Sequence, residues 1–572
     1  PKLFPYTTLF RSSLNNPQKE WFLRISVWLL TTLAAVAFMM LSPRNLSKVH
    51  QHIRTAGERI AGMRGESLMI FLRQNKMLIF FTFAISWLVY GFELFGFSLS
   101  IDEELTSFGS APDLDVYLRV GRWGIYLLNY VLYPHSILPY YPFLIAISAI
   151  ALCSVLFTGT RIADTPSKLV FAIVFVTHPL HAHYLTFNTS NMYYGIGMAL
   201  TAFSFLLFEK SFSRGKWPVI PYLLLSIIIL AFSVSLYQAM IPFFLVFASF
   251  WVIWRVLEGC DTNLLSSLRT ILWIIAVVII SIGLYKVLDI IIRQIVLGSG
   301  PENQLEYIDH MILWGVLPFK DILWDLIQST GDYLTGSRKD LNYTGWSVKV
   351  FLPLLAALVI VLNAKKRPFI QRVLLLAGLL MLVLSPFSLN IANGKSMPVR
   401  TLMAFPLMMA LVWMLLVHQA PLIFKRIVTV LAFVLFISHF YGNTRLFYAS
   451  YASWQADKVM AARIAERIML LDIPGKYTKP RVAFVGHYAR QQNPLFIKSD
   501  VLGASFFEWD NGNPPRIEGL FRTMGMEEME LVEPEEIKTL KARIEEMPSW
   551  PRKGSVALVD DIVVVKLSDD HR

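Results

Sequence analysis

The sequence predicts a polytopic α-helical membrane protein with a small α/β domain at its carboxyl end. Of the 572 residues, 55% are hydrophobic and 16% are charged, whereas about a quarter of an average soluble protein is charged. Apolar runs of bilayer-spanning length, about 17–25 residues, recur along most of the chain. After about residue 441 this repetition stops, and the sequence takes on the mixed pattern of a soluble domain.

Eleven apolar runs from Met77 onward predict a membrane domain over residues 69–441, with about eleven transmembrane helices. Loops that contain most of the charged residues separate the runs, as is typical of a chain that crosses a membrane repeatedly. The runs cover residues 77–98, 136–158, 168–187, 192–208, 218–236, 238–254, 270–292, 347–363, 373–391, 400–418 and 427–441.

The first residues are set apart from the fold. The stretch LFPYTTLFRS at 3–12 reads as the conceptual translation of a common sequencing adapter, and we expect residues 1–12 to be an assembly scar. Residues 13–68 are then a doubtful extension. They contain one further apolar segment, Trp21–Met40, which could be an additional span.

Lysine and arginine gather in every second loop between the runs. Because basic loops stay in the cytoplasm, the opposite loops should face outward: the loop 99–122, the loop 293–346 and the domain 442–572. The net charge of +12 is therefore an orientation signal, and we expect no nucleic-acid partner. The basic residues are Arg73, Lys76, Arg161, Lys168, Lys210, Arg214, Lys216, Arg255, Arg269, Lys365, Lys366, Arg367, Arg372, Lys425 and Arg426.

Residues 442–572 predict a small extracytoplasmic α/β domain. The segment SYASWQADKVMAARIAERIMLL has apolar residues at helical spacing. The strand-like runs RVAFVG and SVALVDDIVVVKL follow, with an acidic helical stretch around Glu527–Glu546 between them.

The first outer loop places three acids at a membrane exit, in FSLSIDEELTSFG. One interpretation is that Asp102, Glu103 and Glu104 are solvated charges that end a helix. The other is general-base chemistry on a hydroxyl, since neighbouring charges and partial desolvation raise a carboxylate pKa towards neutrality. Adjacent side chains cannot face the same point, so one of Asp102 and Glu103 would be the base and the other would orient it or contact the acceptor. Glu104 is expected to be solvated, and its exposed side chain could then contact substrate.

Arginine at outer span ends is the second signal. Arg122 in GRWG and Arg400 in MPVRT lie where positive charge is otherwise scarce, and arginine is a bidentate phosphate ligand. The alternatives are snorkelling or a structural pair with a loop acid. Trp123 opens a tyrosine-rich segment that we expect to be a helix along the membrane interface. Tyr237 and Gln238 join two spans and are expected to line a polar cavity.

The other motifs exclude several classes of site. His178, His181 and His183 fit no single helix face and lack an accompanying Glu-containing zinc motif, so we expect no metal site. Two cysteines exclude a disulfide framework. The sequence has no Walker motif, dinucleotide fingerprint or serine elbow, so we expect no cofactor and no nucleotide donor. The energy for a reaction would come from an activated substrate in the lipid bilayer.

Five segments, taken in order, resemble the O-antigen glucosyltransferases of the GtrII type over roughly Met69–Leu567. They are FGFSLSIDEE, GRWGIYLLNYVL, LPYYP, SVSLYQA and MPSWPRKGSVALVDDIVVVKL.

The resemblance implies a GT-C-like glycosyltransferase of the bacterial inner membrane, with the catalytic loop and the carboxyl-terminal domain in the periplasm. Asp102 or Glu103 would deprotonate an acceptor hydroxyl in an inverting displacement at undecaprenyl-phosphate glucose. Arg122 or Arg400 would neutralise the leaving phosphate.

Several further features follow from the resemblance. Glu104, Trp123, Tyr237 and Gln238 would contact substrate. The acceptor would be lipid-linked O-antigen or another surface polysaccharide, so the reaction would modify lipopolysaccharide and convert serotype. A glucosyl-lipid synthase and a flippase would be functional partners.

Two other functions remain open from the sequence. A transporter or flippase of lipid-linked saccharide usually shows repeats and charges at mid-span, whereas here ionisable residues gather at outer ends, with Lys286 an exception. An O-antigen polymerase or ligase is disfavoured because the acid motif comes first. Specificity for sugar and acceptor would lie in the loop 298–346, with Tyr307, Arg338, Lys339 and Tyr343, and in the carboxyl-terminal domain.

Overall fold

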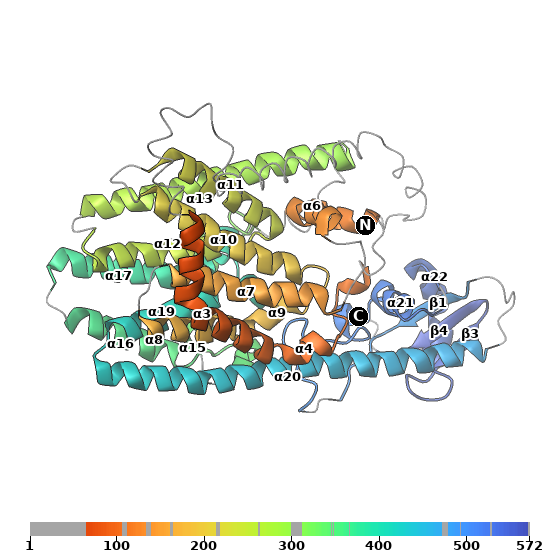
Figure 1. The fold of residues 1–572 in the computed structure, drawn as a ribbon. Helices are drawn as coiled ribbons and strands as arrows, with labels where there is room; N and C mark the ends of the chain where they lie inside the picture. The colour runs from red at the N-terminus through yellow and green to blue at the C-terminus, as the bar shows by residue number, and fades with distance from the viewer. Residues whose placement is uncertain are drawn as a thin grey trace.

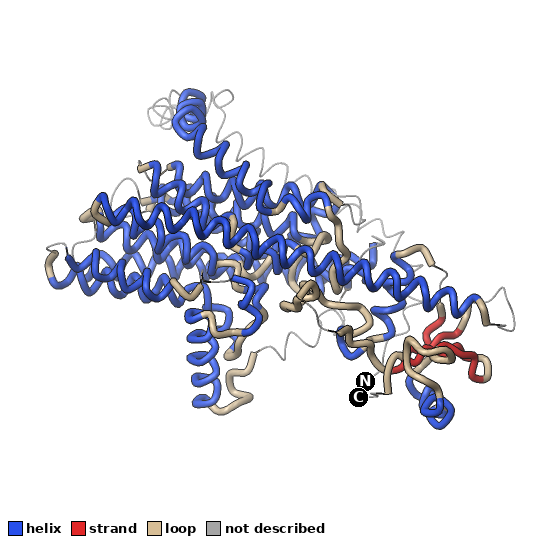
Figure 2. The backbone as a smooth tube through the Cα atoms, turned by 90° about the horizontal axis from the view of Figure 1, so that it is seen from below, coloured by secondary structure: helices blue, strands red, loops and turns tan. Residues whose placement is uncertain are grey.

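The chain folds into a helical bundle followed by a small α/β domain (Figures 1 and 2). The computed structural model describes residues 64–105, 111–132, 139–160, 164–212, 218–260, 264–298, 312–344, 346, 348–364, 367–471, 479–491, 494–526 and 529–569. The expected adapter scar, most of the doubtful extension with its apolar run, and Tyr307 lie outside the described residues.

A helix covers most of each predicted apolar run except 168–187, which is divided among α8, η2 and α9. Within the described residues, six helices are long and apolar enough to cross a bilayer: α7, α10, α12, α13, α17 with its continuation to Asn393, and α20. Three more, α11, α16 and α19, are apolar but shorter. The multi-span helical class is thus supported, and the count of eleven spans stays a prediction. The bundle helices are α3 (Arg64–Val89), α7 (Tyr141–Gly159), α8 (Thr165–Val176), α10 (Asn191–Ser211), α11 (Ile220–Leu236), α12 (Met240–Leu257), α13 (Leu264–Leu297), α16 (Phe351–Ala364), α17 (Phe369–Leu384), α19 (Phe405–Gln419) and α20 (Leu422–Met469).

Helix α19 forms the centre of the bundle. Every residue from Phe405 to Val417 is buried, as expected for a helix that is apolar on all sides. In contrast, α13 and the inner half of α20 expose rows of leucine and isoleucine. These exposed faces are where the bundle would meet lipid.

Further helical elements connect the bundle helices, and η1, α6 and η6 among them hold predicted site residues. The helix predicted after Arg122 is present as α6, and its Trp123 and Tyr126 are buried in the bundle core. Its position along a membrane interface stays a prediction. The connecting elements are α4 (Gly91–Phe95), η1 (Glu103–Leu105), α5 (Ala111–Arg119), α6 (Trp123–Leu132), η2 (Pro179–His181), α9 (Ala182–Leu185), α15 (Phe319–Thr335), η4 (Lys339–Thr344), η5 (Ser385–Phe387), α18 (Ser388–Asn393) and η6 (Val399–Thr401).

The carboxyl-terminal domain is built on a mixed four-stranded sheet with the order β2-β1-β4-β3. Strand β1 (Arg481–Val485) pairs in parallel with β2 (Glu530–Leu531) and β4 (Ile562–Lys566), and β3 (Val556–Val559) pairs antiparallel with β4. Both predicted strand regions are confirmed. The remaining elements are η7 (Trp509–Asn511), α21 (Pro514–Thr523), α22 (Pro534–Thr539) and α23 (Lys541–Glu546).

One helix connects the two parts of the molecule. Helix α20 has 48 residues and is therefore about 72 Å long, more than twice the ~30 Å of a hydrocarbon core. Figure 1 shows it running beneath the bundle and on to the sheet. The amphipathic segment that the sequence indicated is the outer half of this helix, so the expected boundary at 441 lies inside a continuous helix.

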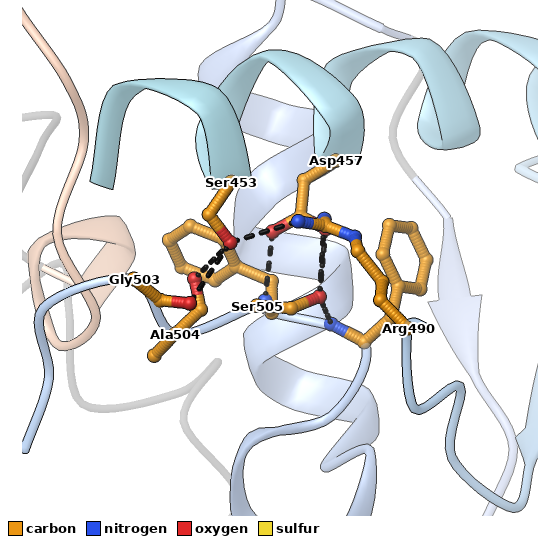
Figure 3. A network of polar contacts seen from close by, with 8 residues as sticks. Ser453, Asp457, Arg490, Gly503, Ala504 and Ser505 are labelled. Atoms are coloured by element: carbon orange, nitrogen blue, oxygen red, sulfur yellow. Dashed lines mark hydrogen bonds and ion pairs between the residues drawn. The ribbon is translucent and has the colours of Figure 1, made fainter. Parts of the chain in front are cut away.

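A buried polar network joins the outer half of α20 to the loop 499–507 (Figure 3). Asp457 is fully buried; it pairs with Arg490 and accepts hydrogen bonds from Ser505 Oγ at 2.7 Å and from the Phe506 amide at 2.9 Å. Ser453 Oγ donates to the Ala504 carbonyl at 2.8 Å. The loop is thus held by side chains that lie one turn apart on a single helix.

We predict that Asp457→Ala lowers the free energy of unfolding by about 3–5 kcal/mol, because it leaves the Arg490 charge buried without its carboxylate. Thermal unfolding of the full chain in detergent measures this. Asp561→Ala breaks an exposed pair with Arg481 and should cost less than about 1 kcal/mol. Equal effects of the two substitutions would contradict the structural role of the network.

Candidate active site

The three adjacent acids of the loop 99–122 lie in different environments. Asp102 has a left-handed backbone with φ of 78° and a side chain that is 48% exposed. Glu103 and Glu104 follow in η1 and are both fully buried. The expectation that Glu104 is solvated is therefore wrong. Its burial results from helix α21 of the carboxyl-terminal domain, which packs on η1.

The Glu103 carboxylate links the acid loop to the segment before α10 through hydrogen bonds. One carboxylate oxygen accepts a hydrogen bond from the Thr189 amide at 2.9 Å. The other accepts from the Ser100 amide at 2.9 Å and from Asn188 Nδ2 at 3.2 Å. Burial raises the pKa of Glu103 to about 7, and these hydrogen bonds act against that rise.

Arg516 of α21 links the acid loop to the carboxyl-terminal domain. Its Nη1 lies 2.8 Å from Asp102 Oδ1 and 2.8 Å from Glu104 Oε1, and its Nε lies 2.7 Å from Asp510 Oδ2. Burial raises the pKa of Glu104 to about 7 although the Arg516 charge lowers it. A Cβ atom at Gly519 would lie 2.8 Å from Glu104 Cγ, so glycine at this position allows the close approach.

Arg122 lies on the face of two tyrosine rings. Its Nη1 donates to the Tyr194 hydroxyl at 3.0 Å, and its guanidinium is 4.7 Å from the centre of the Tyr237 ring. The turn before it is held by Gln238 Nε2, which donates to the Val120 carbonyl at 3.0 Å. Gln238 thus supports the position of Arg122.

Arg400 of η6 pairs with a residue of the carboxyl-terminal domain. Its Nη1 pairs with Asp500 Oδ1 at 2.9 Å, and its guanidinium is 5.9 Å from the centre of the Phe187 ring. Burial raises the pKa of the Tyr237 phenol to about 12, and the charges of both Arg122 and Arg400 act against this rise. Arg122 thus contacts the Tyr237 ring, and Arg400 lies near enough for its charge to lower the pKa of the Tyr237 phenol.

Tyr117 connects the arginines to the acids. Its hydroxyl donates to the Thr189 carbonyl at 3.4 Å, directly beside the amide that binds Glu103. The charges of Arg122 and Glu103 both act on the pKa of Tyr117, which burial raises well above its usual value. Trp123, in contrast, is 4% exposed and packs on Phe232 in the bundle core.

His178, His181 and His183 form hydrogen bonds with other protein groups. A hydrogen bond of 2.6 Å joins His183 Nε2 to the Tyr343 hydroxyl, and another of 2.6 Å joins His181 Nε2 to the Phe175 carbonyl. His178 accepts from the Leu180 amide at 3.1 Å. Among the described residues, no group of three His, Cys, Asp or Glu side chains is placed to hold a metal ion.

Sequence reasoning missed Arg516 and Asp500. Both lie in the carboxyl-terminal domain, and Arg516 is 412 residues from Glu104 along the chain. No spacing or motif marks either residue. A polar residue whose partner comes from another part of the fold leaves no local pattern in the sequence.

A family model with the description Glucosyl transferase GtrII matches residues 91–417 of this chain, more than half of its length. The matched segment contains the acid loop, Arg122, Tyr237, Gln238 and Arg400, and it ends before Asp500 and Arg516. No curated protein and no solved structure matches the chain.

We predict that Glu104→Gln becomes more stable relative to the wild type as the pH rises from 5 to 8. The pKa of Glu104 is raised to about 7 in the folded protein from an ordinary value of 4.5. Its contribution to stability is therefore fully present below about pH 4.5 and is lost as the pH rises through 7, whereas glutamine does not titrate. The difference in Tm between variant and wild type at each pH measures this.

The control is Glu535→Gln, at an exposed position on α22. Its Tm difference from the wild type should stay nearly constant over the same pH range. A Glu104→Gln difference that also stays constant, or that falls, would contradict the assignment.

Proposed function

This chain belongs to the GtrII glucosyltransferase family, and we propose that it transfers glucose from undecaprenyl-phosphate glucose to a hydroxyl of lipid-linked O-antigen. Family membership makes it a glycosyltransferase and implies a membrane enzyme that modifies O-antigen. The donor, the mechanism and the sidedness form the proposal. The family assignment also favours the enzyme over a flippase of lipid-linked saccharide.

The observation that carries the proposal is the set of contacts that links Arg122 to the Tyr237 ring, Tyr117 to Thr189, and Thr189 to Glu103 of the acid loop. The charges of Arg122 and Arg400 both lower the pKa of the Tyr237 phenol. The charges of Arg122 and Glu103 both act on the pKa of Tyr117. A displacement at a glycosyl phosphate needs positive charge at the leaving phosphate and a carboxylate at the attacking hydroxyl. The cluster supplies both.

Asp102 is the better candidate for the base. Its carboxylate is 48% exposed, whereas both oxygens of Glu103 are buried in hydrogen bonds to the protein. A base must come within hydrogen-bond reach of the acceptor hydroxyl. The left-handed backbone at Asp102 is also a conformation that functional sites often hold.

In the proposed reaction the acceptor hydroxyl attacks the anomeric carbon of glucose. Its proton passes to the Asp102 carboxylate as the new glycosidic bond forms. The bond between the anomeric carbon and the phosphate oxygen breaks, and its electron pair leaves on the phosphate with inversion at the carbon. Arg122 and Arg400 stabilise that negative charge, a contribution of several kcal/mol in comparable sites.

Glu103 and Arg516 position the base in this proposal. Glu103 holds the Ser100 amide two residues before Asp102 and joins the loop to Thr189. Arg516 contacts Asp102 directly. Tyr237 supports Arg122 through its ring and remains a candidate for substrate contact, whereas Glu104 is buried against α21.

The donor places the reaction at the outer face of the inner membrane. A sugar carried on undecaprenyl phosphate is synthesised by one enzyme and must be moved across the bilayer by a flippase, so both are expected functional partners. The acid loop and the carboxyl-terminal domain would then lie in the periplasm.

We predict that Asp102→Asn lowers glucose addition to the host polysaccharide about 100-fold or more, because general-base catalysis contributes 100- to 10,000-fold. The measurement is the hexose content of polysaccharide from cells that supply the donor, together with the amount of protein in the membrane. Asp560→Asn is the control, since Asp560 is also left-handed, exposed and paired with an arginine. A double variant of Asp102→Asn and Glu103→Gln that still modifies the polysaccharide would refute the proposed mechanism.

A labelling experiment tests the sidedness. The exposed Cys260 lies in a loop expected to be cytoplasmic, and Cys153 is buried. In intact spheroplasts, we predict that a membrane-impermeant maleimide leaves Cys260 unlabelled. The variant Glu535→Cys in a Cys260→Ser background should be labelled. The reverse pattern would overturn the periplasmic assignment.

A further inference from the structure

We propose that Asp500 is a positioning residue of the donor-phosphate site, which holds the Arg400 guanidinium ready for the phosphate. The inference rests on the proposed function, because it assigns a partner to the arginine that would bind the donor. Arg400 Nη1 and Asp500 Oδ1 are 2.9 Å apart, with side chains 31% and 14% exposed. Asp500 lies outside the segment that the family model matches.

Asp500 occupies the tip of a tight turn. The Ser499 amide donates to the Leu502 carbonyl at 3.0 Å, and the Leu502 amide donates back to the Ser499 carbonyl at 3.0 Å. Asp500 is left-handed, with φ of 50°, which aspartate tolerates better than most residues. The backbone therefore fixes the direction in which the carboxylate leaves the turn.

The residues after Asp500 anchor this turn in both hydrophobic cores. Val501 is 4% exposed and belongs to the core of the carboxyl-terminal domain. Leu502 is fully buried and belongs to the core of the helical bundle. Because neighbouring residues insert into different cores, the turn cannot shift without opening one of them.

Helix α20 holds the loop after the turn. The Gly503 amide donates to Ser450 Oγ at 3.0 Å, and Ser453 and Asp457 bind residues 504–506 as Figure 3 shows. Gly503 has φ of 73°, and a Cβ atom there would lie 1.9 Å from the Ile497 carbonyl oxygen. The loop is thus closely packed, and Asp500 is presented from a rigid support.

A rigid carboxylate suits the orientation of a flexible arginine. A guanidinium has five N–H donors, and the bond to Asp500 uses Nη1, so other N–H groups of Arg400 remain for phosphate oxygens. Ordering the long side chain before the donor arrives lowers the entropy lost on binding. The opposite role, in which Asp500 competes with the phosphate for Arg400, would require the carboxylate to move away, and its packing opposes that movement.

The test is donor kinetics with the purified full chain in lipid nanodiscs, a short-chain polyprenyl-phosphate glucose and lipid-linked O-antigen. We expect Asp500→Ala and Asp500→Asn to raise the donor KM about tenfold, with little change in the acceptor KM and in Tm. Asp500→Glu should recover part of the loss. Asp560→Asn, in the hairpin turn between β3 and β4, is the matched control and should leave the donor KM unchanged.

A double-variant cycle separates positioning from general stability. Arg400→Ala alone should raise the donor KM, and adding Asp500→Ala should raise it by less than threefold more, because Asp500 acts through Arg400. A donor KM that is unchanged or lower in Asp500→Ala, while Arg400→Ala raises it, would overturn the positioning role alone. A donor KM that Arg400→Ala leaves unchanged would overturn the phosphate-binding role of Arg400 and the positioning role with it.

Discussion

The buried carboxylate of Glu104 is the constraint on which the arrangement of the site depends. A carboxylate without exposure needs a cation close by, since an unpaired buried charge is very costly. Within the described residues its ion pair is with Arg516, which the carboxyl-terminal domain supplies. The same guanidinium holds Asp102 at 2.8 Å. The carboxyl-terminal domain therefore supplies the cation that pairs with the acids of this loop. Helix α20 is continuous from bundle to domain and maintains the position of the domain.

The carboxyl-terminal domain contributes one arginine and one aspartate to the ion pairs of the candidate site. Arg516 pairs with Asp102 and Glu104 of the loop 99–122, and Asp500 pairs with Arg400 of η6. Apolar contacts also join the acid loop to the domain, because Leu99 and Ile101 of this loop insert into the core of the domain. The family model ends at residue 417, so these complementary groups lie beyond the segment that marks the family.

Local patterns predicted the elements well because each apolar run or alternating run specifies its own burial. The runs 400–418 and 270–292 predicted helices, and the structure has α19 and α13 there. The strands in RVAFVG and SVALVDDIVVVKL were predicted equally directly. The solvation of Glu104 was predicted wrongly, because exposure at a loop depends on what packs over it, and here that is α21. The domain boundary expected at 441 falls inside α20, because the helical pattern of the sequence continues through that position.

The sequence by itself determined the helical membrane class, the mixed carboxyl-terminal domain, the family and the set of acids and arginines worth testing. These features depend on residue type and on spacing along the chain, which periodicity and charge record directly. Only the tertiary structure decided that Arg122 lies on the Tyr237 ring, that Glu103 is buried while Asp102 is exposed, and that Arg516 and Asp500 pair with the loop acids and with Arg400. Contacts between residues hundreds of positions apart arise from packing of whole helices and domains, and such packing has no local signature.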